Sequence, residues 1–457
     1  MKELGKAVAV CLLLAGLCGA RSVSGESNGK RPPNVILVMA DDLGYECIGA
    51  YGGTSYKTPH IDRLAETGIR FDHAHAQPIC TPSRVQIMTG KYNVRNYVKF
   101  AHLDPKETSF GNLFRDAGYK TCMVGKWQLG GGYDAPGNFG FDNYCMWRLI
   151  NNGNISRYPN PGIAMDGKFV SHENGEYGPD VLFDYASGFI EKNRDEPFFL
   201  YYSMLLVHNP FEPTPQSDQW NPEARGLDNI KGSDFNDITH FPDMMEYMDK
   251  EIGKLIAKLE DLGVRENTVV IFTGDNGTTQ GVTSKVNGKA VRGGKGLPTD
   301  AGTHVPLIAN CPGLIPEGQA SADLVDFSDI LPTLCDIGGV PVPASLSSSI
   351  DGRSFWPQMQ GLAGSPRDWT YGWYQRRTDR NEIWEFVRDK RYKLYLDGNF
   401  YDLENDILEL EPLESTSLTD GQKAVRDQFQ QVLDRYASLR PDELRSPNKR
   451  PGFHRKK

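Results

Sequence analysis

The 457-residue sequence has little excess charge of either sign and no long apolar run beyond its N-terminal segment. Its 59 acidic and 50 basic residues leave a net charge of −9, which gives no support to nucleic-acid binding by general electrostatic attraction. No later stretch is apolar over the roughly 20 residues that a transmembrane helix needs. We therefore expect no transmembrane segment and no nucleic-acid partner.

Cysteine is also scarce, with eight residues in the whole chain. Cys11 and Cys18 lie in the N-terminal segment, and Cys80 belongs to a motif described below. The others are Cys47, Cys122, Cys145, Cys311 and Cys335. Their odd number and wide scatter do not indicate a disulfide framework, so we interpret most of them as small buried apolar residues.

The N-terminus has a basic start, an apolar run at residues 7–17, and the small residues Gly19 and Ala20 before Arg21. This order is typical of a secretory signal peptide at residues 1–20, which predicts a secreted or periplasmic protein. A lipoprotein anchor on Cys18 is the alternative, but Leu17 before it does not fit the usual small-residue context. Residues 21–33, rich in Ser, Gly and Pro, are predicted to be a flexible leader.

Continuous apolar runs of strand length alternate with helical patterns along the chain. The strand-like runs are residues 34–40, 121–124, 198–202, 268–272 and 305–309, and the helical patterns include residues 59–67, 180–191 and 243–262. Apolar runs of this length indicate strands that are buried on both faces of a sheet. The pattern therefore predicts a doubly wound α/β main domain at residues 34–362.

The sequence changes in character near residue 366. Short aromatic-rich runs at residues 369–374, 383–388, 392–396 and 400–403 are separated by turn signals, and a helical pattern follows at residues 422–439. We predict a small antiparallel sheet with one helix, a subdomain at residues 366–440. The basic tail, residues 441–457, is predicted to be disordered.

Residues 80–84 read Cys-Thr-Pro-Ser-Arg and precede a short amphipathic run that ends at Gly90. Thr81 is predicted as N-cap and Pro82 as the first helical residue, so a helix should begin at Cys80. Free N–H groups at a helix start suit a tetrahedral oxyanion, and Arg84 would share a face with Cys80. A buried structural thiol beside a surface arginine is the alternative, which the spacing alone does not exclude.

Polar residues follow several of the predicted strands, among them the adjacent pairs Asp41-Asp42 and Asp275-Asn276. The carboxyl ends of strands converge in an open α/β sheet, so these pairs should lie at one crevice. Carboxylate and amide oxygens, without histidine or thiolate, favour Ca²⁺ over zinc. A lone Asp-Asp pair is more often a loop or a helix cap, but convergence of both pairs favours a cation site.

The Cys80 motif resembles the signature of the formylglycine-dependent sulfatases, in the alkaline-phosphatase-like superfamily. The resemblance extends from Asn34 to about Asn405 and implies a mixed sheet sandwiched by helices, with the sulfatase catalytic domain at residues 34–362. It implies that a formylglycine-generating enzyme oxidises Cys80 and that the hydrated aldehyde is the nucleophile. It also implies calcium ligation by Asp41, Asp42, Asp275 and Asn276 together with the modified Cys80.

The same resemblance gives roles to the remaining site residues. Lys126 and Lys295 match lysines that bind the sulfate oxygens, and His208 matches the histidine at the leaving-group oxygen. Asp275 is the expected base, and Arg84 would orient the hydrate. By their sequence context alone, the lysines would be solvated surface charges and His208 a structural residue. Glycines beside both lysines are expected to let the backbone approach an anion.

Two positions depart from the family pattern. The usual Gly-Lys-Trp-His-Leu-Gly appears at residues 125–130 with Gln128 in place of the histidine that is thought to deprotonate the second hydroxyl. An amide cannot take up a proton near neutrality. Either another group replaces it, or turnover is slow, or the site is a variant. His304 stands in a segment where the family often has arginine, as either a substrate contact or a structural residue.

The leading hypothesis is an exported sulfatase that acts on a sulfated carbohydrate. One alternative is a phosphate or phosphonate ester hydrolase of the same superfamily, and another is a non-catalytic homologue that binds sulfated glycans. Loops at residues 133–161, 171–179 and 211–237 are predicted to form the pocket rim. Their composition does not identify the substrate.

Overall fold

The computed structural model describes residues 31–150, 153–154, 156–224, 237–377 and 382–445. The described residues from Pro32 onward belong to one compact unit. The predicted signal peptide, nearly all of the leader and most of the tail lie outside the described residues, so those predictions stay predictions. Within the described ranges, no helix has both the length and the apolar character needed to cross a membrane.

The centre of the molecule is a mixed sheet of eleven strands among the described residues. The strand order is β11-β2-β12-β8-β1-β7-β3-β4-β5-β6, with β13 paired to β2. The strands are β1 Asn34–Ala40, β2 Ile69–His75, β3 Lys120–Lys126, β4 Asn143–Trp147, β5 Gly162–Met165, β6 Lys168–Ser171, β7 Phe198–Ser203, β8 Thr268–Gly274, β11 His304–Val305, β12 Leu307–Asn310 and β13 Gln319–Asp326. A separate hairpin consists of β9 Thr283–Val286 and β10 Lys289–Arg292.

Strand β1 lies in the middle of this sheet and pairs in parallel with both β7 and β8. Its side chains alternate between two apolar cores: Val35 and Leu37 belong to one, and Ile36 and Val38 to the other. Each face of the strand is therefore buried, which explains its unbroken apolar run. The carboxyl ends of β1, β3, β7 and β8 lie at the same edge because these strands are parallel.

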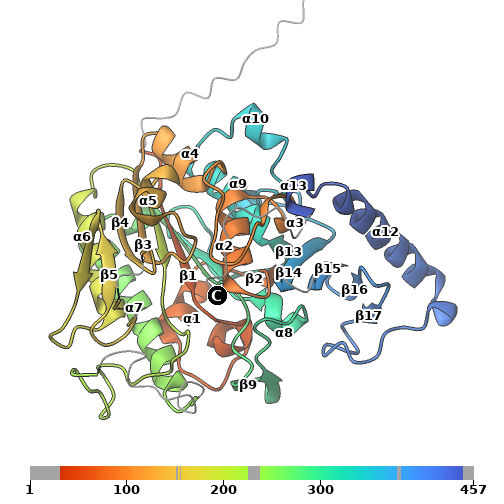
Figure 1. Cartoon of the computed structure of the whole chain (residues 1–457), viewed down its shortest axis with the longest axis horizontal. Helices are drawn as coiled ribbons and strands as arrows, with labels where there is room; N and C mark the ends of the chain where they lie inside the picture. The colour runs from red at the N-terminus through yellow and green to blue at the C-terminus, as the bar shows by residue number, and fades with distance from the viewer. Residues whose placement is uncertain (1–30, 151–152, 155, 225–236, 378–381, 446–457) are drawn as a thin grey trace, which may run out of the picture. The chain divides into compact units, whose positions relative to one another are not determined.

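Helices cover both faces (Figure 1), as the sequence predicts. On one face lie α1 Pro59–Glu66, α6 Gly178–Lys192 and α7 Phe241–Asp261, and on the other α2 Cys80–Thr89, α4 Phe110–Asp116 and α9 Ile330–Gly338. Short helices are α3 Asn93–Asn96, α5 Ala135–Asn138, α8 Asp300–Thr303, α10 Ala344–Ser347 and α11 Trp356–Met359. Single 3₁₀ turns are η1 Tyr45–Cys47, η2 Gly49–Tyr51, η3 Gly132–Asp134, η6 Arg265–Asn267, η7 Phe327–Asp329 and η8 Ser415–Ser417.

The C-terminal part is the predicted antiparallel sheet with one helix. Its strands are β14 Thr370–Arg377, β15 Glu382–Arg388, β16 Tyr392–Tyr395 and β17 Phe400–Asp402, followed by α12 Asp420–Ala437 (Figure 1). Aromatic and aliphatic side chains of the sheet and of α12 form a third core with residues of α3. The mixed α/β fold class with a small C-terminal sheet is therefore confirmed.

Three local predictions are wrong. The predicted strand 305–309 is two strands, β11 and β12, because Pro306 between them has no N–H to donate. The predicted boundary of the tail at residue 441 is too early, because α13 Asp442–Arg445 follows and the Arg440 guanidinium donates to the Leu444 carbonyl. The predicted cap at Thr81 is also wrong, as described below. The five scattered cysteines are buried and unpaired, as expected.

Candidate active site

Cys80 is the first residue of helix α2, so the predicted helix start is right but its cap is not. Ile79 is the N-cap and gives no side-chain hydrogen bond. Thr81 and Pro82 lie inside the first turn, and the Thr81 hydroxyl accepts instead from the Ala101 N–H at 3.2 Å. Because Pro82 has no backbone N–H, the first turn of α2 has one donor fewer that needs a hydrogen-bond acceptor. Helix α2 is buried along its whole length and ends at Gly90, as predicted.

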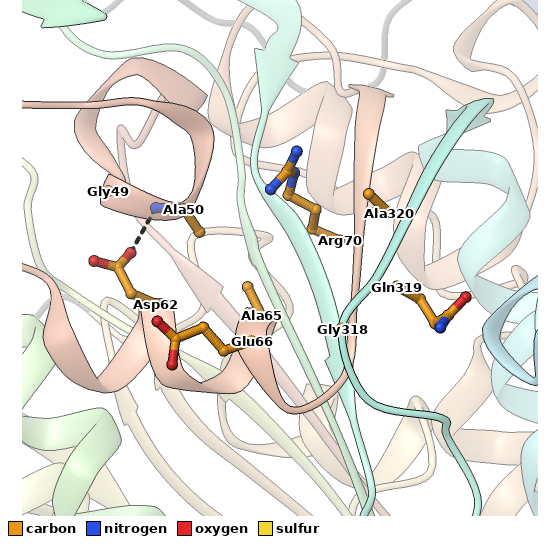
Figure 2. Close-up of a pocket in the computed structure, with 9 residues that line it drawn as sticks. All are labelled: Gly49, Ala50, Asp62, Ala65, Glu66, Arg70, Gly318, Gln319 and Ala320. Atoms are coloured by element: carbon orange, nitrogen blue, oxygen red, sulfur yellow. Dashed lines mark hydrogen bonds between the residues drawn. The ribbon is translucent and has the colours of Figure 1, made fainter. Parts of the chain in front are cut away.

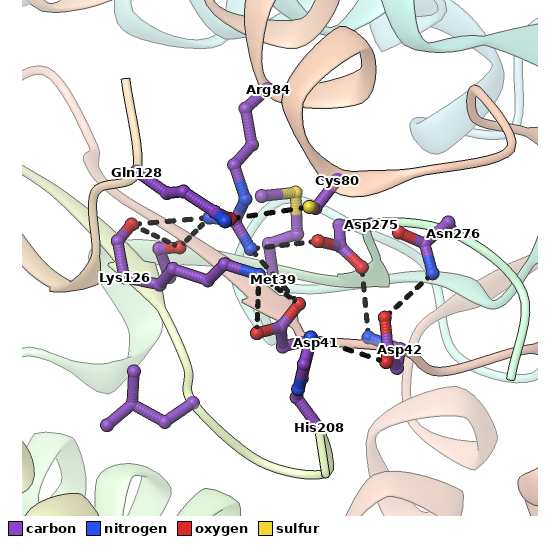
Figure 3. Close-up of polar contacts among 12 residues, drawn as sticks. Met39, Asp41, Asp42, Cys80, Arg84, Lys126, Gln128, His208, Asp275 and Asn276 are labelled. Atoms are coloured by element: carbon purple, nitrogen blue, oxygen red, sulfur yellow. Dashed lines mark hydrogen bonds and ion pairs between the residues drawn. The ribbon is translucent and has the colours of Figure 1, made fainter. Parts of the chain in front are cut away.

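Asp41 lies at the carboxyl end of β1, between two cations. Both of its carboxylate oxygens accept from Lys126 Nζ at 2.8 Å, and Arg84 Nη2 is 3.6 Å from Oδ1 (Figure 3). Arg84 Nη2 also donates to Asp275 Oδ2 at 2.9 Å. These side chains are almost entirely buried. The predicted convergence of β1, β3, β8 and α2 on one site is therefore present in the structure.

Asp42 extends the same cluster on its other side. Its backbone N–H donates to Asp275 Oδ1 at 2.9 Å, while its carboxylate accepts from Asn276 Nδ2 at 3.0 Å and from Lys295 Nζ at 2.5 Å. Lys295 Nζ also lies 3.0 Å from His208 Nε2. All of the predicted oxygen ligands, both lysines and His208 thus meet within one connected network.

Burial and neighbouring charges set opposite protonation tendencies within this cluster. Burial alone would raise the pKa of Asp41, but Lys126 and other cations hold that pKa well below its usual range. Burial and the charge of Asp41 raise the pKa of Asp275 to about 7, although Arg84 opposes the shift. Asp275 can therefore exchange a proton near neutral pH, whereas Asp41 stays ionised.

His208 is neutral in this setting, because burial lowers its pKa to about 3 despite the nearby charge of Asp42. Its Nδ1 is 2.5 Å from the Asn209 carbonyl oxygen, which places the ring proton on Nδ1. Nε2 is then an acceptor for the Lys295 ammonium. Burial also raises the pKa of the Cys80 thiol, so an unmodified Cys80 stays protonated.

Gln128, which stands where the family pattern has histidine, lies beside Cys80 in the active site. It follows β3, has a φ of 50°, and accepts a hydrogen bond from Cys80 Sγ through Oε1 at 3.4 Å. Figure 3 shows the two side chains pointing toward each other across the site. An amide, rather than an imidazole, therefore contacts the residue at position 80.

The cluster contains the donors that a hard cation needs. Asp41, Asp42 and His208 each offer a ligand atom within 4.8 Å of the others. Asn276 Oδ1 is buried and accepts no hydrogen bond from a described residue. A buried carbonyl oxygen without a donor is suited to a cation. The residues therefore fit a divalent ion, and His208, which the sequence assigned only to the leaving group, lies among the nearest donors.

His304 is a structural residue in this fold. Its Nδ1 is 3.1 Å from Asp300 Oδ2, and its Nε2 is 3.0 Å from the Asp72 carbonyl oxygen. The ring also stacks on Tyr45, with centroids 4.0 Å apart. Both ring nitrogens are thus engaged by protein, which favours the structural alternative.

Sequence reasoning missed two polar neighbours of the site. Ser203, at the end of β7, hydrogen-bonds Arg84 and donates to the Lys126 carbonyl at 3.0 Å. Arg157, from the predicted rim loop, has Nη1 3.9 Å from Asp41 Oδ2. Neither residue lies in a recognisable sequence motif. The position of Ser203 at the end of a predicted strand was the one sequence feature that could have placed it at the site.

A surface pocket of about 270 Å³ lies away from the residues of the active site, between α1, β2 and β13 (Figure 2). Asp62, which lines it, accepts from the Ala50 N–H at 2.7 Å, and Arg70 pairs with Asp72 at 2.8 Å. Its charged groups therefore already have protein partners, and none of the site residues described above lines it.

Comparison with known proteins agrees with this site. A family model described as Sulfatase matches residues 33–340, more than half of the chain, and one described as N-sulphoglucosamine sulphohydrolase, C-terminal, matches residues 295–437. Arylsulfatase A of Homo sapiens is 30% identical over 400 residues, which cover 80% of this chain and 75% of that protein. N-acetylgalactosamine-6-sulfatase of Mus musculus is 31% identical over 383 residues, which cover 76% of this chain and 70% of that protein.

Steryl-sulfatase of Mus musculus is 28% identical over 428 residues, and the match spans 73% of this chain but 66% of that protein. Among solved structures, the PsFucS1 sulfatase from Pseudoalteromonas sp. has a TM-score of 0.71 at 26% identity, covering 90% of this chain and 92% of that one. This likeness confirms the expected alkaline-phosphatase-like sulfatase fold. The chain belongs to the sulfatase family and is an arylsulfatase-like hydrolase of sulfate esters.

Proposed function

We propose that this sulfatase removes sulfate from a sulfated carbohydrate, using formylglycine made from Cys80 and one bound Ca²⁺. The observation that carries the proposal is the position of Cys80, at the start of α2, beside the buried network in which Lys126 pairs with Asp41 and Arg84 pairs with Asp275. A carbohydrate substrate is supported by the relative named N-acetylgalactosamine-6-sulfatase and by the C-terminal match to the N-sulphoglucosamine sulphohydrolase model.

Charge balance explains why a divalent cation suits this site. Asp41, Asp42 and Asp275 are matched by Lys126, Lys295 and Arg84, so these six groups sum to no net charge when Asp275 is ionised. A sulfate ester brings a further negative charge into a buried place, which costs free energy unless a positive charge offsets it. We expect Asp41, Asp42, Asp275 and Asn276 to hold Ca²⁺ together with the modified Cys80.

When present, the hydrated formylglycine supplies the nucleophilic hydroxyl, and the cation offsets charge on the sulfate oxygens. The chain's own residues hold and move the protons. Asp275, with its pKa raised to about 7, accepts a proton from the attacking hydroxyl, and Arg84 keeps that carboxylate in place at 2.9 Å. Lys126 and Lys295 bind the sulfate oxygens.

The proton for the departing alcohol is held at the contact between Lys295 Nζ and His208 Nε2. His208 is neutral with its proton on Nδ1, so it cannot by itself deliver a proton from Nε2. Lys295 lies close enough to supply one. We therefore assign the general-acid role to the pair rather than to His208 alone.

The test is sulfate release by protein produced with a formylglycine-generating enzyme, against sulfated sugars and matched phosphate esters. We expect sulfate release from at least one sugar, an aldehyde or its hydrate in the mass spectrum of the Cys80 peptide, and no release by Cys80→Ala. Faster hydrolysis of the phosphate esters would favour the phosphohydrolase alternative. Sugar binding without any release would favour the non-catalytic one, which Gln128 makes worth testing.

Export is part of the same proposal. The basic start and short apolar run of residues 1–20 support a signal peptide, which would place the enzyme outside the cytoplasm. N-terminal sequencing of protein recovered from the periplasm or medium should begin at Arg21. Recovery of a lipid-modified Cys18 at the N-terminus would instead support the anchored alternative.

A further inference from the structure

Arg157 brings one more cation to the edge of the active site. Its side chain is 11% exposed, and Nη1 lies 3.9 Å from Asp41 Oδ2, which is too long for a hydrogen bond. Nη1 is buried and has no hydrogen-bond partner among the described residues. Buried donors are normally satisfied, so an unpaired guanidinium N–H beside a substrate site is suited to an acceptor on the ligand.

The guanidinium is held in place before any ligand arrives. Its central carbon lies 4.1 Å from the centre of the Trp147 ring, and Trp147 Nε1 donates to the Ser156 carbonyl at 3.1 Å. At the next residue of the chain, the Tyr158 hydroxyl donates to the Leu205 carbonyl oxygen at 2.9 Å, which joins this segment to the loop that carries His208. A stacked arginine with anchored neighbours loses little conformational freedom on binding.

The charge of Arg157 is not cancelled by the site carboxylates. Asp41, Asp42 and Asp275 are each paired with one of the three other cations, as described above. Glu212 is near enough for the charge of Arg157 to lower its pKa, but burial raises that pKa to about 7. Glu212 therefore carries only part of a negative charge at neutral pH, and its Oε2 has no hydrogen-bond partner among the described residues.

We propose that Arg157 determines specificity by binding a second anionic group of the substrate, a sulfate or a carboxylate, next to the sulfate that is cleaved. The proposal rests on the proposed function and deepens it, because Arg157 would make the enzyme favour doubly charged sugars over singly charged ones. A guanidinium presents two parallel N–H donors to such a group.

The experiment compares kcat/KM for matched pairs of substrates. One pair is N-acetylglucosamine 6-O-sulfate and glucosamine 2-N,6-O-disulfate, and the other is N-acetylgalactosamine 6-sulfate with and without a linked glucuronate. Wild type should favour the doubly charged member of at least one pair. Arg157→Gln should reduce that preference by about 10- to 100-fold, the range expected for a hydrogen bond to a charged group. Most of the change should appear in KM.

Arg148 provides a matched control. Its guanidinium also lies over Trp147, at 5.3 Å, but its side chain is exposed. Arg148→Gln should leave the preference unchanged, and Arg157→Lys should restore only part of it. An equal loss on both members of a pair, an equal effect of Arg148→Gln, or a wild type without preference would each overturn the proposal.

A binding measurement tests the role of Arg157 independently of whether the enzyme releases sulfate. Calorimetry with glucosamine 2-N,6-O-disulfate should show weaker binding to Arg157→Gln than to wild type, whether or not sulfate is released. If wild type releases sulfate from 4-nitrophenyl sulfate but both proteins bind the disulfate equally, the proposed function stands and the role of Arg157 is refuted. Thermal melting of each variant checks that it is folded.

Discussion

Replacing Gln128 with histidine tests the position where the site departs from its family. Gln128 Oε1 is 3.4 Å from Cys80 Sγ, so an imidazole on the same Cα would reach the group at position 80. The φ of 50° adds no new strain, because histidine enters the left-handed region more readily than most residues. A general base contributes about 10²- to 10⁴-fold, or roughly 3 to 5 kcal/mol of barrier. We expect sulfate release to quicken by at least about 10-fold in Gln128→His.

Rapid mixing with 4-nitrophenyl sulfate separates the release of the alcohol from the release of sulfate. Wild type should give a burst of about one nitrophenol per active site, followed by a slower steady phase. Gln128→His should raise the steady rate and leave the burst rate unaltered, because Asp275 and Lys295 serve the first phase. Gln128→Ala is the control that removes the amide. If both of its phases equal those of wild type, Gln128 is a bystander and the reasoning is refuted.

Three further perturbations follow from the buried charges. Asp42→Ala should abolish calcium binding by calorimetry together with sulfate release, and full wild-type activity after exhaustive chelation would contradict this. Burial lowers the pKa of His75 well below its usual range and its ring has no hydrogen-bond partner among the described residues, so stability should fall as pH drops below about 6.5, by roughly 2 kcal/mol at pH 5. His75→Leu should flatten that decline in urea titrations, and an unchanged slope would count against it. Arg388→Met leaves the buried Asp300 with His304 as its one remaining charge partner among the described residues, which should cost about 3 to 5 kcal/mol, and a loss below 1 kcal/mol would show that the Arg388 pair is dispensable.

The inner strands could be predicted from sequence because they are buried on both faces. Strands β1 and β8 contain an unbroken apolar run, which no other local structure of that length explains as well. Strand β2 could not be found in this way, because Arg70, Asp72 and His73 interrupt its apolar residues. Its three partners, β11, β12 and β13, come from residues far along the chain, so local sequence did not indicate the pairing.

The membership of the site was predictable for a similar reason, but its internal pairing was not. Strand ends on one edge must converge, so Asp41, Lys126 and Asp275 could be placed together before their geometry was known. Which cation contacts which carboxylate depends on the length and conformation of each side chain and on how far each strand extends toward the site. Arg157 lay in a loop with no distinguishing motif, and only the fold brings its guanidinium to Asp41.

Two of the glycines beside the site lysines also let backbone segments pack closely. Their expected role, to let the backbone approach an anion, stays a prediction. A Cβ on Gly125 would lie 1.7 Å from the Ser203 carbonyl oxygen, and one on Gly294 would lie 2.5 Å from the backbone of Ala301. These glycines let neighbouring backbone segments touch each other. Such close approach is what sets Lys126 and Lys295 at hydrogen-bond distance from Asp41 and Asp42, so the charge pattern of the site depends on backbone packing as much as on the charged residues themselves.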